Sequence, residues 1–227
     1  MEVRHGRQGC ELRLDGSVAS LQRAGAEVTG PVWYALAAPL WALPRHRRRS
    51  ILILGLGGGS AAHVLRAAAP DAHIVGVERE PRMVAAARRH FGLGRLRVEV
   101  VVADAIAFLE RERRRFDLVL EDLFFGRPSE LRKPAGFPHP GLGLAARRVK
   151  RGGVLAANTI HEGPAVARTL RCVAPHATLL SIEVRGFYNR IYAAGPSALT
   201  AGRLRPELAQ VPAFRTALPQ LALRTLR

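Results

Sequence analysis

The chain has 227 residues, 48% of them hydrophobic, a size that can bury one core of ordinary dimensions. No stretch approaches the roughly 18 consecutive apolar residues of a membrane-spanning helix, so we expect a soluble protein without a membrane partner. The net charge of +17 suits nucleic acid, but nearly every basic residue is arginine in a chain rich in Ala, Gly and Pro. A GC-rich genome produces that bias whatever the function, so nucleic acid is kept only as one possible partner.

The start of the chain and its cysteines indicate a compartment. Met1 to His5 carry charge where a secretory signal needs apolar residues, and the two cysteines, Cys10 and Cys172, form no disulfide framework. We therefore expect a cytoplasmic protein. No group of His and Cys has metal-ligand spacing, so no metal site is predicted.

Residues 1–49 are predicted to form an N-terminal unit. Two short segments of strand-forming character, 11–14 and 18–21, flank Asp15-Gly16. This dipeptide is suited to the turn of a tight hairpin. Pro31 then opens an apolar helix that extends to Ala38. Because exposed strand edges tend to pair, this β-hairpin makes a homodimer one expectation.

From Ser50 the sequence alternates strand-length apolar runs with helix-length segments, which is typical of a parallel sheet covered by helices. The link around Gly186 is too short for a crossover helix, so the last two strands should be antiparallel. The expected fold is α/β, the Rossmann-like class I methyltransferase fold, with a mostly parallel seven-stranded sheet and a final antiparallel hairpin. The predicted strands are 51–54, 73–77, 96–102, 116–120, 154–158, 178–184 and 190–194. The predicted helices are 61–69, 82–91, 105–113, 142–149 and 164–173.

These elements make residues 50–200 the predicted catalytic domain. Residues 201–227 form a C-terminal tail in which Pro206, Pro212 and Pro219 interrupt irregular apolar spacing, and no chemistry is assigned to it.

The strongest local signal is the glycine-rich segment after the first predicted strand. Glycines let the backbone turn sharply and approach a ligand closely, so a cofactor site is expected here. A tight turn without a ligand is the alternative. The glycines assigned to cofactor binding are Gly55, Gly57, Gly58 and Gly59.

Two carboxylates follow the next two predicted strands. Glu78 stands where an acid accepts hydrogen bonds from both ribose hydroxyls of an adenosine. Asp104 can accept from the exocyclic amine of adenine, or cap the following helix, or do both. Gly57, Gly59 and Ala62 can also be aligned with a nicotinamide fingerprint, but the tighter glycine spacing and Asp104 favour a methyltransferase-type site.

The chain resembles the spermidine synthase (polyamine aminopropyltransferase) superfamily over roughly residues 15–194, and the segments that carry the resemblance are 51–60, 77–81, 97–104 and 116–122. The resemblance implies a site for S-adenosylmethionine or its decarboxylated form, with Glu78 on the ribose and Asp104 with Ala105 on the adenine. Arg79 falls within the motif and is assigned to the same site. The most specific matching segment is Glu78-Arg79-Glu80-Pro81, similar to the family's Glu-x-Asp-Pro.

The chain departs from the family's polyamine motifs. Gly58 stands where aminopropyltransferases carry an Asp that grips the aminopropyl amine, and Phe125 replaces the second of two acids that face the polyamine. A polycationic substrate needs several carboxylates, because unpaired buried ammonium groups are costly. The leading hypothesis is therefore an S-adenosylmethionine-dependent methyltransferase acting on a small-molecule acceptor. An aminopropyltransferase, a nucleic-acid base methyltransferase and a non-catalytic homologue remain alternatives.

Asp122 is the predicted catalytic residue, because it follows the fourth strand where an acceptor would meet the donor. It could orient an attacking amine or accept its proton. The neighbouring Glu121 should point the other way and be structural. The Gly- and Pro-rich segment 124–143 is predicted to be a substrate loop, with Phe124, Phe125 and His139 as candidate lining residues.

Overall fold

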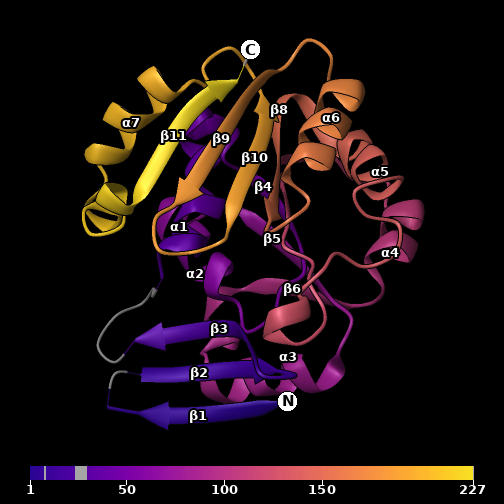
Figure 1. Cartoon of the computed structure of the whole chain (residues 1–227), viewed down its shortest axis with the longest axis vertical. Coiled ribbons are helices and arrows are strands. Elements are labelled where there is room, and N and C mark those ends of the chain that lie inside the picture. Colours follow the sequence, from indigo (N-terminus) through magenta and orange to yellow (C-terminus); the bar gives the residue numbers. More distant parts are fainter. Residues whose placement is uncertain (8, 24–29, 227) are drawn as a thin grey trace.

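The larger of two sheets has eight strands, parallel and antiparallel (Figure 1). Its strand order is β11-β9-β10-β8-β7-β4-β5-β6. The computed structural model describes residues 1–7, 9–23 and 30–226. Neighbours from β6 through β8 are parallel, whereas β10 is antiparallel to both β8 and β9. The parallel sheet and its final antiparallel hairpin are thus as predicted. The strands are β4 (Ser50–Leu54), β5 (His73–Glu78), β6 (Val98–Val102), β7 (Phe116–Glu121), β8 (Val149–Thr159), β9 (Thr178–Val184), β10 (Arg190–Gly195) and β11 (Leu221–Leu226).

Helices cover both faces of this sheet, with α1, α2 and α7 on one side and α4, α5 and α6 on the other (Figure 1). Alternate residues of β4 supply the two cores: Ile51 and Ile53 face the first set, Leu52 and Leu54 the second. Within the described residues, no helix has the length and apolar character needed to cross a membrane. The α-helices are α1 (Pro31–Ala37), α2 (Ser60–Ala68), α3 (Pro81–His90), α4 (Ala105–Arg111), α5 (Gly141–Arg147), α6 (Gly163–Val173) and α7 (Ala201–Ala209).

Two predicted boundaries were wrong by a few residues. Leu96 ends a short 3-10 helix (Leu93–Leu96), and β6 begins only after Arg97, whose φ of 51° is incompatible with a strand. Helix α5 ends at Arg147, because Val149 already pairs with Phe116 as the first residue of β8. The left-handed backbone at Arg97 therefore sets the start of β6, and strand pairing sets the end of α5.

The N-terminal sheet has three strands, not the two of the predicted hairpin. The predicted turn is confirmed: Asp15 and Gly16 have φ values of 50° and 85° between β2 (Gly9–Leu14) and β3 (Ser17–Arg23). The added strand, β1 (Glu2–Gly6), pairs antiparallel with β2. The sheet packs on α3 through a cluster that includes Leu12 and Met83.

The C-terminal tail completes the large sheet. Strand β11 pairs antiparallel with β9 and extends the sheet by one strand beyond the predicted seven. Helix α7 forms despite Pro206 in its interior. Phe214 is fully buried, with its ring centroid 4.7 Å from that of Trp41 and 5.1 Å from that of Tyr34. The tail therefore has a structural role that its broken apolar spacing concealed.

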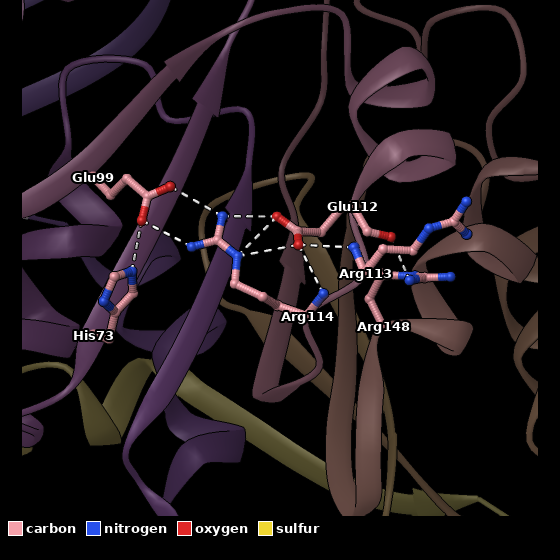
Figure 2. A network of polar contacts seen from close by, with 6 residues as sticks. All are labelled: His73, Glu99, Glu112, Arg113, Arg114 and Arg148. Carbon is pink, nitrogen blue, oxygen red and sulfur yellow. Dashed lines mark hydrogen bonds and ion pairs between the residues drawn. The ribbon is translucent and has the colours of Figure 1, made fainter.

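A charge network ties elements together at the amino ends of the parallel strands (Figure 2). Arg114, just before β7, donates to the carboxylates of Glu99 and Glu112, and Glu99 also contacts His73. The hydrogen bonds from Arg114 hold the pKa values of both glutamates below their usual range. Because the network lies at the edge opposite the carboxyl ends of the strands, we assign it a structural role.

Candidate functional site

Parallel pairing of β4, β5, β6 and β7 brings four chain segments to one edge of the sheet. Leu54, the last residue of β4, pairs with Val77 on one side and with Glu121 on the other. The glycine loop after β4 therefore lies between Glu78 and Asp122. Open α/β sheets bind their ligands at this carboxyl edge.

The glycine loop joins β4 to α2 through three residues in the left-handed region. Gly55, Gly57 and Gly59 have φ values of 86°, 54° and 89°, which side chains rarely adopt. Gly55 also abuts the backbone after β7: an added Cβ would lie 2.5 Å from the carbonyl oxygen of Asp122. The loop is thus held closely against the strand end that carries the predicted catalytic residue.

Gly58 is packed for a different reason. Its N–H donates to Ser20 Oγ of β3 over 2.7 Å, and an added Cβ would lie 2.6 Å from the Ser20 Cβ. The N-terminal sheet therefore closes over this part of the loop. Sequence reasoning did not connect Ser20 with the site, because 38 residues separate it from Gly58.

The Glu78 carboxylate is fixed against the glycine loop. Its Oε2 accepts from the Gly57 N–H over 2.9 Å, and its Oε1 accepts from the Glu80 N–H over 3.0 Å. Glu80 in turn caps α3 by accepting from the Arg82 N–H, with Pro81 at the first helical position. Arg79 lies exposed beside these groups. The Glu78–Pro81 motif thus places one carboxylate at the site and starts the next helix.

Asp104 lies at the next strand end. It is exposed and caps α4, its Oδ1 accepting from the N–H groups of Ile106 (2.9 Å) and Ala107 (3.1 Å). Ala105 is buried at the start of that helix. The Ala103 N–H donates to the Glu78 carbonyl over 3.1 Å, so these two strand ends are adjacent. The capping role expected for Asp104 is observed.

Asp122 follows β7 and is held by a residue that the sequence did not single out. Its Oδ1 accepts from Asn158 Nδ2 over 2.8 Å, and its backbone N–H donates to the Leu54 carbonyl. Burial raises the pKa of the Asp122 carboxyl, while the hydrogen bond from Asn158 opposes that rise. Asn158 is 2% exposed on β8. A polar residue near the carboxyl end of a predicted buried strand was the sequence signal that could have identified it.

The neighbouring Glu121 forms a buried ion pair instead of facing the site. Its Oε1 lies 2.6 Å from Lys133 Nζ and also accepts from the Leu123 N–H, whereas its Oε2 is buried and has no hydrogen-bond partner among the described residues. Burial raises the pKa of Glu121. Lys133 Nζ lies 4.0 Å from the centroid of the Phe124 ring. Glu121 therefore ties the predicted substrate loop to the sheet, a structural role as expected.

The structure does not gather all of the predicted loop residues around Asp122. Phe124 lies under Lys133, as described above. Phe125 pairs with Arg132 through two backbone hydrogen bonds of 3.1 Å, and the Arg132 guanidinium lies 4.9 Å from its ring centroid. His139 is exposed two residues before α5. The loop fold thus engages both phenylalanines in contacts with basic side chains.

Comparison with known proteins bears on the fold that carries this site. Residues 51–133 match the family model described as a methyltransferase domain. A solved structure of human methyltransferase-like protein 13, in complex with SAH, has a TM-score of 0.67 at 23% identity, over 84% of this chain and 93% of that one. The fold is that of the class I methyltransferases. A probable spermidine synthase from Corynebacterium glutamicum has a TM-score of 0.76 at 18% identity, over 99% of this chain and 86% of that one.

A curated relative matches a shorter stretch. It is the eEF1A lysine and N-terminal methyltransferase homolog of Drosophila pseudoobscura pseudoobscura, 40% identical over 80 residues. That match covers 34% of this chain and 12% of the relative, so the chain spans a small part of that protein's length. The homolog from Drosophila melanogaster is also 40% identical, over 83 residues.

Proposed function

We propose that this protein is an S-adenosylmethionine-dependent methyltransferase with a spermidine-synthase-like architecture. The observation that carries the proposal is the hydrogen bond from the Gly57 N–H to the Glu78 carboxylate, which joins the glycine loop to the acid after β5. Asp104 follows the adjacent strand. The match of residues 51–133 to a methyltransferase domain supports the same function.

The side chains at this edge suit an adenosine cofactor. Glu78 is half-buried and has lone pairs beyond its two backbone contacts, so it can accept from ribose hydroxyls. Asp104 accepts its two capping bonds on Oδ1, which leaves Oδ2 to accept from the adenine amine beside Ala105. Gly55, Gly57 and Gly59 carry no side chain, so the remainder of the cofactor can approach the loop backbone closely, while their own N–H groups stay bonded to Val77, Glu78 and Leu56.

Gly58 bears on which donor is bound. S-adenosylmethionine carries a carboxylate that its decarboxylated form lacks, and an acid at position 58 would repel that carboxylate. The glycine removes the repulsion. We therefore propose S-adenosylmethionine as the cofactor, with its decarboxylated form as the alternative.

The cofactor supplies a methyl group on a cationic sulfur, which is activated for direct displacement. Asp122 would orient the acceptor and take the proton that its nucleophilic atom loses. Because burial raises the pKa of Asp122, this carboxyl is a stronger base than an exposed aspartate. No covalent enzyme intermediate is needed.

For the acceptor, we propose a small molecule with a nucleophilic nitrogen. Asp122 can accept from such a group, and the nearby Phe124 supplies an apolar surface. The curated relatives are named for methylation of a lysine and an N-terminus, so a protein amine is the second candidate. A nucleic-acid acceptor is third, supported by the net charge of +17.

An aminopropyltransferase remains the principal alternative reaction, because the likeness to a spermidine synthase structure extends over 99% of the chain. It is disfavoured by the residues that would face a polyamine. Phe125 stands in place of an acid. The Lys133 ammonium pairs with Glu121, the neighbour of Asp122, and offsets its negative charge. A cationic substrate would therefore meet less negative charge near Asp122 than the number of acids there implies.

Calorimetry with the two donors tests the proposal. We expect S-adenosylmethionine to bind at least as tightly as decarboxylated S-adenosylmethionine. A preference of tenfold or more for the decarboxylated donor, together with spermidine formation from putrescine, would replace the methyltransferase by the aminopropyltransferase. Failure to bind either donor would remove the proposed enzymatic function altogether.

A further inference from the structure

A chain of two side-chain amides leads from the surface to Asp122. Asn158 Nδ2 donates to Asp122 Oδ1 over 2.8 Å, and Asn189 Nδ2 donates to Asn158 Oδ1 over 3.1 Å. Asn158 is buried in β8, whereas Asn189 is half-buried in the turn between β9 and β10. Three separate segments of the chain therefore meet in one hydrogen-bonded series.

The two hydrogen bonds together favour one orientation of the Asn158 amide. If that amide rotated by half a turn, its carbonyl oxygen would face the Asp122 carboxylate, which has no proton to donate when ionised. Its NH₂ group would then meet the NH₂ group of Asn189. The contact with Asp122 would be repulsive, and the contact with Asn189 would be lost unless its amide also rotated, so the hydrogen bond from Asn189 favours the donating orientation of Asn158.

We propose that Asn158 is the positioning residue for Asp122 and that Asn189 fixes the orientation in which Asn158 acts. This inference rests on the proposed function only for the catalytic use of Asp122. The positioning itself follows from the two hydrogen bonds. Its consequence is that one carboxylate oxygen is held by Asn158, and that this hydrogen bond favours the ionised form of the carboxyl against the effect of burial.

The other charged groups near Asp122 are Lys133 of the substrate loop and Glu121 of β7. The Lys133 ammonium favours the ionised form of Asp122. The same ammonium forms an ion pair with Glu121 Oε1, so it interacts with both acids. Burial of Asp122 acts in the opposite direction and raises its pKa. Loss of the Asn158 hydrogen bond should therefore raise this pKa further.

The titration of Asp122 can be measured without knowing the acceptor. The chain has five aspartates, so a sample with ¹³C-labelled Asp side-chain carboxyls gives a small set of NMR signals, assigned by their loss in Asp122→Asn. We expect Asn158→Leu to raise the Asp122 pKa by roughly one to two pH units. Asn189→Ala should move it in the same direction by a smaller amount, because Asn158 then loses only its anchor.

Thr159→Val is the matched control. Thr159 lies next to Asn158 on β8 and donates to the Arg190 carbonyl over 2.8 Å, so its loss removes a comparable bond to β10. We expect Thr159→Val to be less stable than the wild type and to have the same Asp122 pKa. An Asp122 pKa that is unchanged in Asn158→Leu, or that moves equally in Thr159→Val, would overturn the proposal.

Two further comparisons keep the inference separate from folding and from the proposed function. If Asn158→Leu does not fold, Asn189→Ala at the half-buried turn decides the question. An unchanged Asp122 pKa in Asn189→Ala would then overturn the proposal. Binding of S-adenosylmethionine to the wild-type protein is measured separately by calorimetry. Absence of binding would overturn the proposed function and leave the positioning of Asp122 to be judged by the titration alone.

Discussion

Glu78 Oε2 accepts a hydrogen bond from the backbone N–H of Gly57 across 2.9 Å, and this contact links β5 to the loop that follows β4. The same carboxylate accepts from the Glu80 N–H through its other oxygen. Its orientation is therefore set by the protein's own backbone. A ligand that hydrogen-bonds to Glu78 meets a group that is already in place, which reduces the entropy cost of binding.

Glu78→Ala should weaken S-adenosylmethionine binding by roughly 2 to 4 kcal/mol, because it removes two charge-assisted hydrogen bonds to the ribose. Isothermal titration calorimetry on the folded variant measures the loss. Glu80→Ala is the control, since Glu80 caps α3 and contacts Arg82. Equal affinities in wild type and Glu78→Ala would rule out the proposed ribose site.

Gly58→Ala should destabilise the fold by roughly 1 to 3 kcal/mol, because its Cβ would meet Ser20 at 2.6 Å in a closely packed region. Urea denaturation of Gly58→Ala, Ser20→Gly and the double variant measures the coupling. We expect the double variant to be more stable than the sum of the single effects. Simple additivity would mean that β3 does not press on the loop as described.

The same contact changes how donor choice must be tested. Gly58→Asp alone displaces Ser20, so its effect on binding mixes packing with charge. In a Ser20→Gly background, we expect Gly58→Asp to shift preference toward decarboxylated S-adenosylmethionine by about 1 to 2 kcal/mol relative to Gly58→Asn. Calorimetry with both donors at two salt concentrations checks that the shift is electrostatic.

Lys133→Met should cost roughly 3 to 5 kcal/mol near neutral pH, because it leaves the buried Glu121 carboxylate without its partner. The pKa of Glu121, already raised by burial, should rise further. A carboxyl with a higher pKa in the folded state binds more protons when folded, so stability falls as pH rises above the ordinary value of 4.5. The deficit of Lys133→Met should therefore grow between about pH 4.5 and pH 7.

Urea denaturation across that pH range measures the deficit. Lys150→Met is the control, because Lys150 is the only other lysine and its 3.0 Å contact with Asp117 is partly exposed. We expect a cost of about 0 to 1 kcal/mol there. A deficit of Lys133→Met that shrinks toward neutral pH would contradict the assigned ion pair.

Phe214→Ala should cost roughly 3 to 5 kcal/mol of unfolding free energy, because the ring is fully buried against Tyr34 and Trp41. Phe187→Ala, at a side chain that is 50% exposed, should change stability by less than about 0.5 kcal/mol. Chemical denaturation separates the two. Similar costs would show that the C-terminal tail is not part of the core.

The sequence by itself determined the parallel sheet, the turn at Asp15-Gly16 and the positions of Glu78, Asp104 and Asp122 at strand ends. These features depend on local signals: apolar runs of strand length, a dipeptide with a known turn preference, and acids that directly follow buried strands. Parallel pairing then brings any such strand ends to one edge, so the candidate site could be located without coordinates.

Only the tertiary structure decided what contacts each of those residues. Ser20 on Gly58, Lys133 on Glu121 and Asn158 on Asp122 join positions 12 to 38 residues apart, and no local periodicity encodes such pairs. The tail shows the same limit, because β11 is only six residues long, too short for its apolar spacing to distinguish a strand from a helix segment. Strand β11 forms because β9 presents an unpaired edge to it, and that edge exists only once the sheet has assembled.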